Sequence, residues 1–321
     1  NKLGTQMKAT GEVMSIGRTM EESLLKAVRS LETGVCHIYH KKFDKWSNDD
    51  LLAYIKGGTD DRLYAIGQLI RNGVDLALIY DKTKIDMFFL EKFKNIVEFE
   101  NVVRAHPMDV ETLRAAKRMG FSDKYIGQLW GLSQNEMYRL REKNNVFPVY
   151  KMIDTCASEF ASYVPYFYST YEEENESIVS GKEKIIVLGS GPIRIGQGVE
   201  FDYSTVHAIW SIRAAGYEAI IINNNPETVS TDYTTSDKLY FEPLTVEDVM
   251  NVIHLEKPKA IVVSLGGQTA INLAEPLAEL GVPIIGTDTQ AIKNAEDRGC
   301  FEKIMEELEI PQPEAEAVTD I

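Results

Sequence analysis

The sequence predicts two kinds of structure in series: an all-helical domain followed by a Rossmann-like α/β domain with a parallel sheet. Residues 45–145 carry apolar residues at helical spacing, punctuated by capping residues and glycines. Residues 183–297 alternate short β-branched runs with helical patterns, which favours parallel strands with helices on both faces. Between these regions, residues 146–180 lose their periodicity.

The composition is that of a globular protein large enough for about two domains. The chain has 321 residues, of which 44% are hydrophobic and 26% are charged, with a net charge of −15. Such acidity disfavours nonspecific nucleic-acid binding. Three cysteines far apart in the sequence predict no disulfide framework, so we expect a reducing, cytoplasmic location. No apolar run approaches the roughly 18 residues of a membrane span, so we expect no membrane partner.

Residues 1–40 are expected to contain a single helix. Thr19 is a candidate N-cap, with Glu21 and Glu22 in the first turn and Gly34 as a plausible end. One helix with an irregular leader is too little for a domain. The chain also lacks an initiating Met and a signal-peptide pattern, so we expect it to be an internal part of a longer protein.

Residues 41–148 are predicted to form the helical domain, with about five short helices. Candidate N-caps are Ser47, Thr59, Thr83, Ser122 and Ser133, and candidate ends are Gly73, Gly120 and Gly131. Ser133 and Glu136 have the spacing of a capping box. Residues 149–182 are predicted to form an extended connector that lies along a neighbouring domain, because its aromatic residues need burial.

Residues 183–297 are predicted to form the α/β domain, and residues 298–321 to begin a further element. The expected strands are 184–189, 218–223, 238–244, 259–266 and 282–286. The expected helices are 203–215, 245–257 and 268–281, with another over 298–310.

The first strand ends in Gly189-Ser-Gly191, which suggests a dinucleotide-binding loop. A third glycine is absent, because Arg194 stands there, and the second strand ends in asparagines where an acidic residue should bind ribose. A nicotinamide or flavin site is therefore not expected. What remains is a glycine-rich loop that brings the backbone close to a ligand or a wall, or a tight turn with no ligand.

Two further loops follow strands and offer polar groups. Residues 264–269 (SLGGQT) either present amides to an anion at a helix N-terminus or serve packing alone. Residues 225–233 (NPETVSTDY) are expected at the ligand-binding edge of an α/β sheet, but the preferred interpretation of Glu227 and Asp232 is that they are caps or acceptors of loop hydrogen bonds.

Two rival hypotheses come from short motifs. Cys36, His37 and His40 suggest a metal site but lack a fourth ligand, so we expect none. Residues 121–144 are similar to a DNA-binding helix-turn-helix, with Arg139 and Arg141 on the second helix. That segment has no strong basic excess, so packing between subunits is the preferred interpretation and a DNA-binding or scaffold module is the alternative.

Four segments together resemble the large subunit of carbamoyl phosphate synthetase. Residues 189–203 (GSGPIRIGQGVEFDY) and 223–249 resemble the pre-ATP-grasp domain that opens a synthetase half. Residues 149–175 resemble the connector before the second half, and 7–32 resemble the end of the first ATP-grasp domain. The helical block occupies the place of the family's oligomerisation domain. The resemblance covers nearly the whole chain, in the family's order.

The resemblance implies a parent enzyme that makes carbamoyl phosphate from bicarbonate, ammonia or glutamine, and two ATP. It implies ATP and Mg²⁺ or Mn²⁺ in the parent, a glutaminase small subunit as partner, and a role in pyrimidine or arginine biosynthesis. No ATP-grasp core is evident here, so we assign no catalytic residue, expect this part to bind no cofactor and expect it to be inactive alone.

The resemblance further implies that part of the chain forms a wall of the second active site and of an internal tunnel. Arg194 is expected either to steady an anionic intermediate or to pair with Glu200 or Asp202. Gly198 is the first candidate for the tunnel wall, since a larger side chain would project into the passage. The full set of wall candidates is Gly189, Gly191, Arg194, Gly196, Gly198, Glu200, Asn225, Glu227, Gly266, Gly267 and Gln268.

Overall fold

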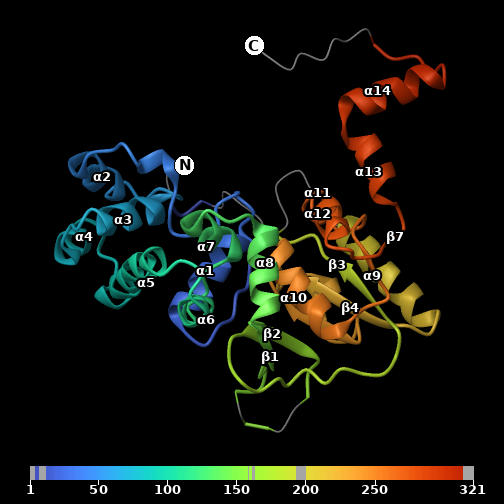
Figure 1. Cartoon of the computed structure of the whole chain (residues 1–321), viewed down its shortest axis with the longest axis horizontal. Coiled ribbons are helices and arrows are strands. Elements are labelled where there is room, and N and C mark those ends of the chain that lie inside the picture. Colours follow the sequence, from blue (N-terminus) through green and yellow to red (C-terminus); the bar gives the residue numbers. More distant parts are fainter. Residues whose placement is uncertain (1–3, 7–11, 158, 161–162, 193–199, 314–321) are drawn as a thin grey trace.

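The computed structural model describes residues 4–6, 12–157, 159–160, 163–192 and 200–313. A layer of helices from residues 20–143 lies beside a seven-stranded sheet from residues 149–285 (Figure 1). The predicted fold class, a helical part followed by a largely parallel α/β part, is confirmed. None of the helices in the described ranges is long and apolar enough to cross a membrane.

The helical layer has more elements than the sequence predicts. Residues 45–145 form seven helices rather than about five. With the preceding α1 they are α1 Met20–Ser30, α2 Asn48–Ile55, α3 Arg62–Arg71, α4 Leu76–Thr83, α5 Met87–Ala105, α6 Val110–Arg118, α7 Asp123–Trp130 and α8 Gln134–Lys143, and a short 3-10 turn η1 spans Lys41–Phe43.

Most predicted helix boundaries are confirmed, and three are wrong, those at Thr59, Gly34 and Thr83. Thr19, Ser47, Ser122 and Ser133 are N-caps, and the Ser133 capping box is complete. The prediction at Thr59 is wrong because α3 begins after Asp61, and α1 ends at Ser30, before Gly34. Thr83 is also not an N-cap: it is the last residue of α4, and its hydroxyl donates to the carbonyl of Ile79 at 2.8 Å.

Helix α1 packs into the core of the helical layer. Leu25 and Val28 belong to the same buried cluster as Ile66 on α3 and Ile96 on α5. The predicted division at residue 40 therefore does not coincide with a division of the core. Among the charged residues of α1, Lys26 and Arg29 are also buried: Lys26 donates to the carbonyl of Ser169 in the sheet, and Arg29 donates to Asp248 in the α/β part.

The sheet has the order β1-β2-β5-β4-β3-β6-β7. Its strands are β1 Val149–Met152, β2 Tyr166–Thr170, β3 Lys184–Leu188, β4 Glu218–Asn223, β5 Lys238–Phe241, β6 Ala260–Val262 and β7 Ile284–Ile285. All neighbours are parallel except β1 and β2. The predicted connector thus supplies two strands of the sheet, although part of its aromatic content, such as Tyr163, is exposed.

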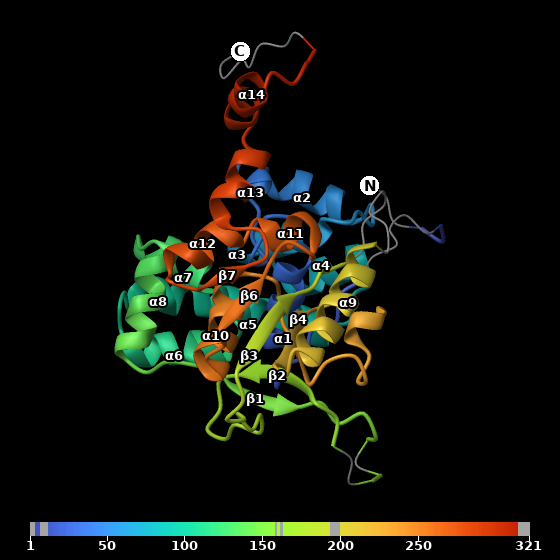
Figure 2. The same ribbon diagram turned by 90° about the vertical axis from the view of Figure 1, so that its right-hand side faces the viewer.

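Helices cover both faces of the sheet, as predicted (Figure 2). Ile185, Val187 and Ile221 point toward α9, Glu200–Ala214, through Ile209. Ile186, Leu188 and Ile222 point to the opposite face and meet α10, Val246–Glu256, and α12, Ala274–Glu279. The alternation along β3 and β4 follows the two-residue period of a strand.

The end of the chain departs from the prediction. The single helix expected over 268–281 is broken into α11, Gly267–Ile271, and α12. Pro276 lacks the N–H that would donate to Asn272, so a continuous helix would lose a hydrogen bond there. Helix α13, Thr289–Glu296, was not predicted. It and α14, Arg298–Glu307, have no buried residue and extend away from the sheet (Figure 1).

Candidate functional site

The candidate site is the carboxyl edge of the central strands. The chain passes from β3 to β4 and β5 on one side of β3, and later to β6 and β7 on the other side. The loops after β3 and β6 therefore separate in opposite directions, which is the topological switch point where open α/β sheets bind ligands. Both glycine-containing loops that the sequence indicated, at Gly189 and at Gly266, lie at this point.

The three loops that follow β3, β4 and β6 touch one another. The backbone N–H of Gly189 donates to the carbonyl of Ile222 at 2.9 Å. A Cβ added to Gly189 would lie 2.5 Å from Cγ of Asn223, and one added to Gly266 would overlap the carbonyl oxygen of Gly189. Glycine is thus required at both positions, because the loops approach too closely there to leave room for a side chain.

The asparagines after β4 hold the loops together. Oδ1 of Asn223 accepts from the N–H of Gly191 at 3.0 Å and from the N–H of Asn224 at 2.9 Å. Asn225 is buried, and its Oδ1 accepts from the N–H of Glu227 at 2.9 Å. The asparagines stand where a dinucleotide site would have an acidic residue. In this structure their side chains stabilise the neighbouring loops by accepting hydrogen bonds from the backbone.

The acidic candidates have loop partners. Asp202 on α9 accepts from the N–H of Val229 at 2.9 Å and so caps the turn η2, Val229–Thr231. Asp232 accepts from the N–H and hydroxyl of Thr234, as the alternative interpretation expected. Glu227 is close to Glu12, and a hydrogen bond between the two carboxyl groups raises the pKa of Glu12.

The remaining wall candidates are dispersed. Glu200 is an exposed residue at the start of α9, and Gly267 packs against the ring of Phe201. The Gln268 amide donates to Asn272 and to Glu296, both at 2.9 Å, so this side chain points toward α13. Arg194, Gly196 and Gly198 lie outside the described residues, so the roles expected of them stay predictions.

Beneath this edge lies a buried network of charges that joins α10 to the helical layer. Lys117 on α6 contacts Asp123 at 3.1 Å and also contacts Glu247 on α10. Asp123 is bonded in turn by Nε of Arg141 on α8 at 2.8 Å. Every one of these side chains is at most 5% exposed.

The same network continues through α1. Arg29 contacts Asp248 at 3.1 Å, and its Nη1 donates to the carbonyl of Gly120 at 2.9 Å. Lys26 lies 3.9 Å from Glu242, which follows β5, and donates to the carbonyl of Ser169 on β2. One helix of the helical layer therefore contacts the ends of two strands and the start of α10.

Opposite signs and burial set the pKa values in the network. Burial would raise the pKa of Glu247, but Lys117, Arg141 and Arg29 lower it to about 2. Burial raises the pKa of Glu242 to about 6, against the opposing effect of Lys26, and nearby Asp248 adds to the rise. In the described structure five carboxylates of this network (Glu22, Asp123, Glu242, Glu247, Asp248) face four cations, so below about pH 6 a proton on Glu242 balances the charge.

This buried charge network was not predicted from the sequence. A signal was present: Leu113, Ala116 and Lys117 share one face of α6, so a lysine stands at a core position of an amphipathic helix.

The cavities of the structure were also not predictable from the sequence. One, of about 400 Å³, lies between α1 and the β6–α11 turn and is lined by Arg29, Glu32, Thr245 and Thr269.

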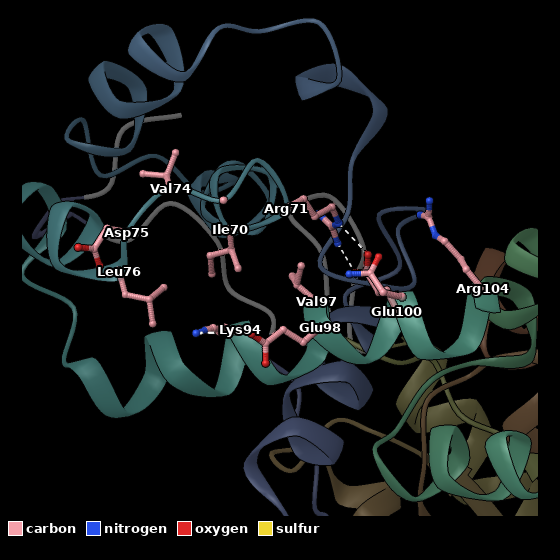
Figure 3. A pocket seen from close by; sticks show the side chains of 12 residues that line it. Ile70, Arg71, Val74, Asp75, Leu76, Lys94, Val97, Glu98, Glu100 and Arg104 are labelled. Carbon is pink, nitrogen blue, oxygen red and sulfur yellow. Dashed lines mark hydrogen bonds and ion pairs between the residues drawn. The ribbon is translucent and has the colours of Figure 1, made fainter. Parts of the chain in front are cut away.

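Another cavity, of about 490 Å³, lies within the helical layer between α3, α4 and α5 (Figure 3). Arg71 and Glu100 face each other across one end of it, with Nε of Arg71 donating to Glu100 at 2.9 Å. Glu100 also bonds Nε2 of His37 at 3.0 Å. Its lining carries both signs of charge, with Lys94 and Arg104 opposed by Asp75 and Glu98.

The two rival motifs take part in ordinary packing. His37 is buried against Glu100, burial lowers its pKa to about 4, and Nδ1 of His40 accepts from the N–H of Lys42. Among the described residues no group of three or more His, Cys, Asp or Glu side chains is placed to hold a metal ion. Arg141 of the helix-turn-helix hypothesis is fully buried on Asp123, so it is not available to a nucleic-acid phosphate.

Comparison with known proteins matches both parts of the chain. Residues 12–145 match the model of the carbamoyl-phosphate synthetase large chain oligomerisation domain. Residues 181–294 match the model of the carbamoyl phosphate synthase pre-ATP-grasp domain. The order of the two matches is the order of the helical and α/β parts.

Solved structures give weaker similarity. A pyruvate carboxylase from Rhizobium etli with acetyl coenzyme A is 12% identical over 40% of this chain, with a TM-score of 0.30. A complete pyruvate carboxylase from the same organism is 14% identical over 41%, also at 0.30. The biotin carboxylase domain of a thermophilic 2-oxoglutarate carboxylase is 19% identical over 39%, at 0.29. The chain spans 12%, 13% and 27% of their respective lengths.

The network predicts a large effect for loss of one buried charge. Glu247→Gln leaves Lys117 and the N–H of Asp123 without their carboxylate, so the free energy of unfolding should fall by about 3 kcal/mol or more. The control is Glu275→Gln in the exposed pair with Lys293, which should change it by less than about 1 kcal/mol. Denaturant unfolding of both variants measures the difference, and equal effects would show that the network adds nothing beyond surface pairing.

Glu242 predicts a characteristic pH dependence. The folded protein keeps the proton up to about pH 6, whereas the unfolded chain releases it near the ordinary value of 4.5. The contribution of Glu242 to the free energy of unfolding is therefore fully present below pH 4.5. It falls by about 2 kcal/mol as the pH rises to 6. Glu242→Gln should remove that fall in unfolding curves measured from pH 4.5 to 7. An unchanged slope would mean that Glu242 is ionised in the folded protein throughout.

Proposed function

The chain belongs to the carbamoyl-phosphate synthetase large-chain family, and we propose that it forms the middle of a synthetase polypeptide. In this proposal the parent makes carbamoyl phosphate from bicarbonate, ammonia or glutamine, and two ATP. It works with a glutaminase small subunit, in the cytoplasm, for pyrimidine or arginine biosynthesis. The observation that supports the proposal most is that both family models match in sequence order, on parts that share one buried charge network.

The α/β part is proposed to form a wall of the site that phosphorylates carbamate. Support comes from the carboxyl edge, where loops after β3, β4 and β6 pack with glycines facing one another and asparagine amides filling the space. A wall of backbone and small residues excludes water without adding a group that reacts with an unstable intermediate. These residues orient and enclose, and none of them is assigned a catalytic role.

ATP and Mg²⁺ or Mn²⁺ are proposed to bind in the ATP-grasp modules of the parent. When bound there, they supply the phosphoryl group and the charge that stabilises its transfer. The described residues of the present chain form no carboxylate group suited to a divalent ion, so no step through ATP or metal is assigned to them.

The helical part is proposed to hold copies of the enzyme together. The matching family model is that of an oligomerisation domain. Exposed large apolar residues lie on two neighbouring helices of this part: Leu78 and Tyr80 on α4, and Phe88 and Phe89 on α5. Exposed apolar side chains in one region are typical of a protein–protein contact.

The wall proposal is tested in the parent polypeptide. Gly266→Val forces a side chain into the loop after β3, so formation of ATP from carbamoyl phosphate and ADP should fall by about 100-fold. Bicarbonate-dependent ATP hydrolysis by the other half should be retained, which also shows that the variant folds. Gly181→Val, where nothing lies within 4 Å, is the matched control. The proposed function fails if the parent makes no carbamoyl phosphate from ATP, bicarbonate and ammonia. The present chain alone should make none.

The oligomerisation proposal is tested by sedimentation of the purified chain. We expect a dimer or larger species, and Phe88→Glu should shift it toward monomer because a charge would be buried in the contact. Tyr203→Glu, at an exposed position on α9, is the control and should leave the mass unchanged. A monomer at all concentrations would remove this role from the helical part.

A further inference from the structure

The segment that leaves α1 reaches the carboxyl edge of the sheet. Helix α1 ends at Ser30, and Glu32 follows with a backbone φ of +56°. A residue with a Cβ pays roughly 1 kcal/mol or more for this left-handed conformation. Such strain persists only where the surrounding contacts require it, so the contacts of Glu32 decide what it does.

The Glu32 side chain lies between two of the three loops. Its Oε2 accepts a hydrogen bond from the hydroxyl of Thr269 at 2.6 Å, in the turn after β6. Its Oε1 lies directly beside Gly191, in the loop after β3, where an added Cβ would overlap it. Gly191 itself has φ +68°, so that loop turns sharply at the point where the carboxylate meets it.

Ser30, two residues before Glu32, reaches the third loop. The carbonyl of Ser30 accepts from Nδ2 of Asn224 at 3.4 Å, and the carbonyl of Asn224 accepts from the N–H of Met14 at 2.8 Å. Residues 30 to 32 thus contact the loops after β3, β4 and β6. The segment itself is held by Arg29, one residue earlier, through the buried pair with Asp248.

We propose that Glu32 is a positioning residue, whose carboxylate holds the Gly191 loop and the Thr269 turn at a fixed separation. The helical layer thereby sets the geometry of the carboxyl edge. The role of this edge as a reaction-site wall rests on the proposed function, but the positioning by Glu32 does not. The cavity of about 400 Å³ beside Glu32, Thr245 and Thr269 is open space into which the Thr269 turn would relax without the Glu32 side chain.

Hydrogen exchange of the whole chain tests the proposal without requiring turnover. In Glu32→Ala the amides of Ser190, Gly191, Gly266 and Gly267 should exchange about ten-fold faster, because a hydrogen bond to a charged group is lost. Amides of α3 and α5 should be unaffected. Glu32→Gln keeps an acceptor oxygen of similar reach and should restore slow exchange. Thr269→Val should reproduce the effect, with no further increase in the double variant.

Glycine variants separate positioning from a simple turn. If residue 32 served only as a turn, Glu32→Gly would relieve strain, stabilise the protein and leave the loop amides protected. The control for that outcome is Lys84→Gly, at the same φ of +56° after α4, which should stabilise without any change at the edge. We expect Glu32→Gly to behave like Glu32→Ala. Unchanged protection of the loop amides in Glu32→Ala or Glu32→Gly would overturn the proposal.

Discussion

The structure depends on the burial of charges of both signs between the helical layer and the sheet. Lys117 and Arg141 come from the helical layer, whereas Glu247 comes from α10. Removing such groups from water costs several kcal/mol per ion, and the attraction between each group and its partners of opposite charge offsets that cost. In either part alone, these side chains would be exposed to solvent or buried without a partner of opposite charge. The two parts therefore require each other, although each has an apolar core of its own.

The contact between the two parts also fixes the position of the candidate site. Arg29 and Lys26 fix α1 against α10 and the end of β2, and the residues that follow α1 meet the loops at the carboxyl edge. The loops at this edge have no room for large side chains at two positions, because Gly189 and Gly266 approach each other directly. A helical layer suited to self-association and a sheet edge suited to enclosing a ligand are thus connected by one short segment.

The sequence predicted the elements better than their connections. The strands at Ile185, Ile220 and Ile261 follow from apolar runs, and the capping box at Ser133 from local chemistry, because such signals involve near neighbours in the chain. The strands of the predicted connector were missed because β1 and β2 are ordered by pairing with β5, far along the chain. The structural roles of Asn223 and Glu32 were not predicted, because their hydrogen-bond partners lie on other loops. Arg141, interpreted as a possible nucleic-acid contact, is buried because Asp123 neutralises it.

The mutual dependence of the two parts is tested most directly by unfolding them with separate probes. Trp46 and Trp130 lie in the helical layer and Trp210 lies on α9, so variants that keep either Trp210 or the other two report on one part each. Denaturant curves from the two variants should coincide in midpoint and slope, because the shared charges make unfolding a single transition. Two separated transitions, with the sheet signal surviving loss of the helical one, would contradict this account.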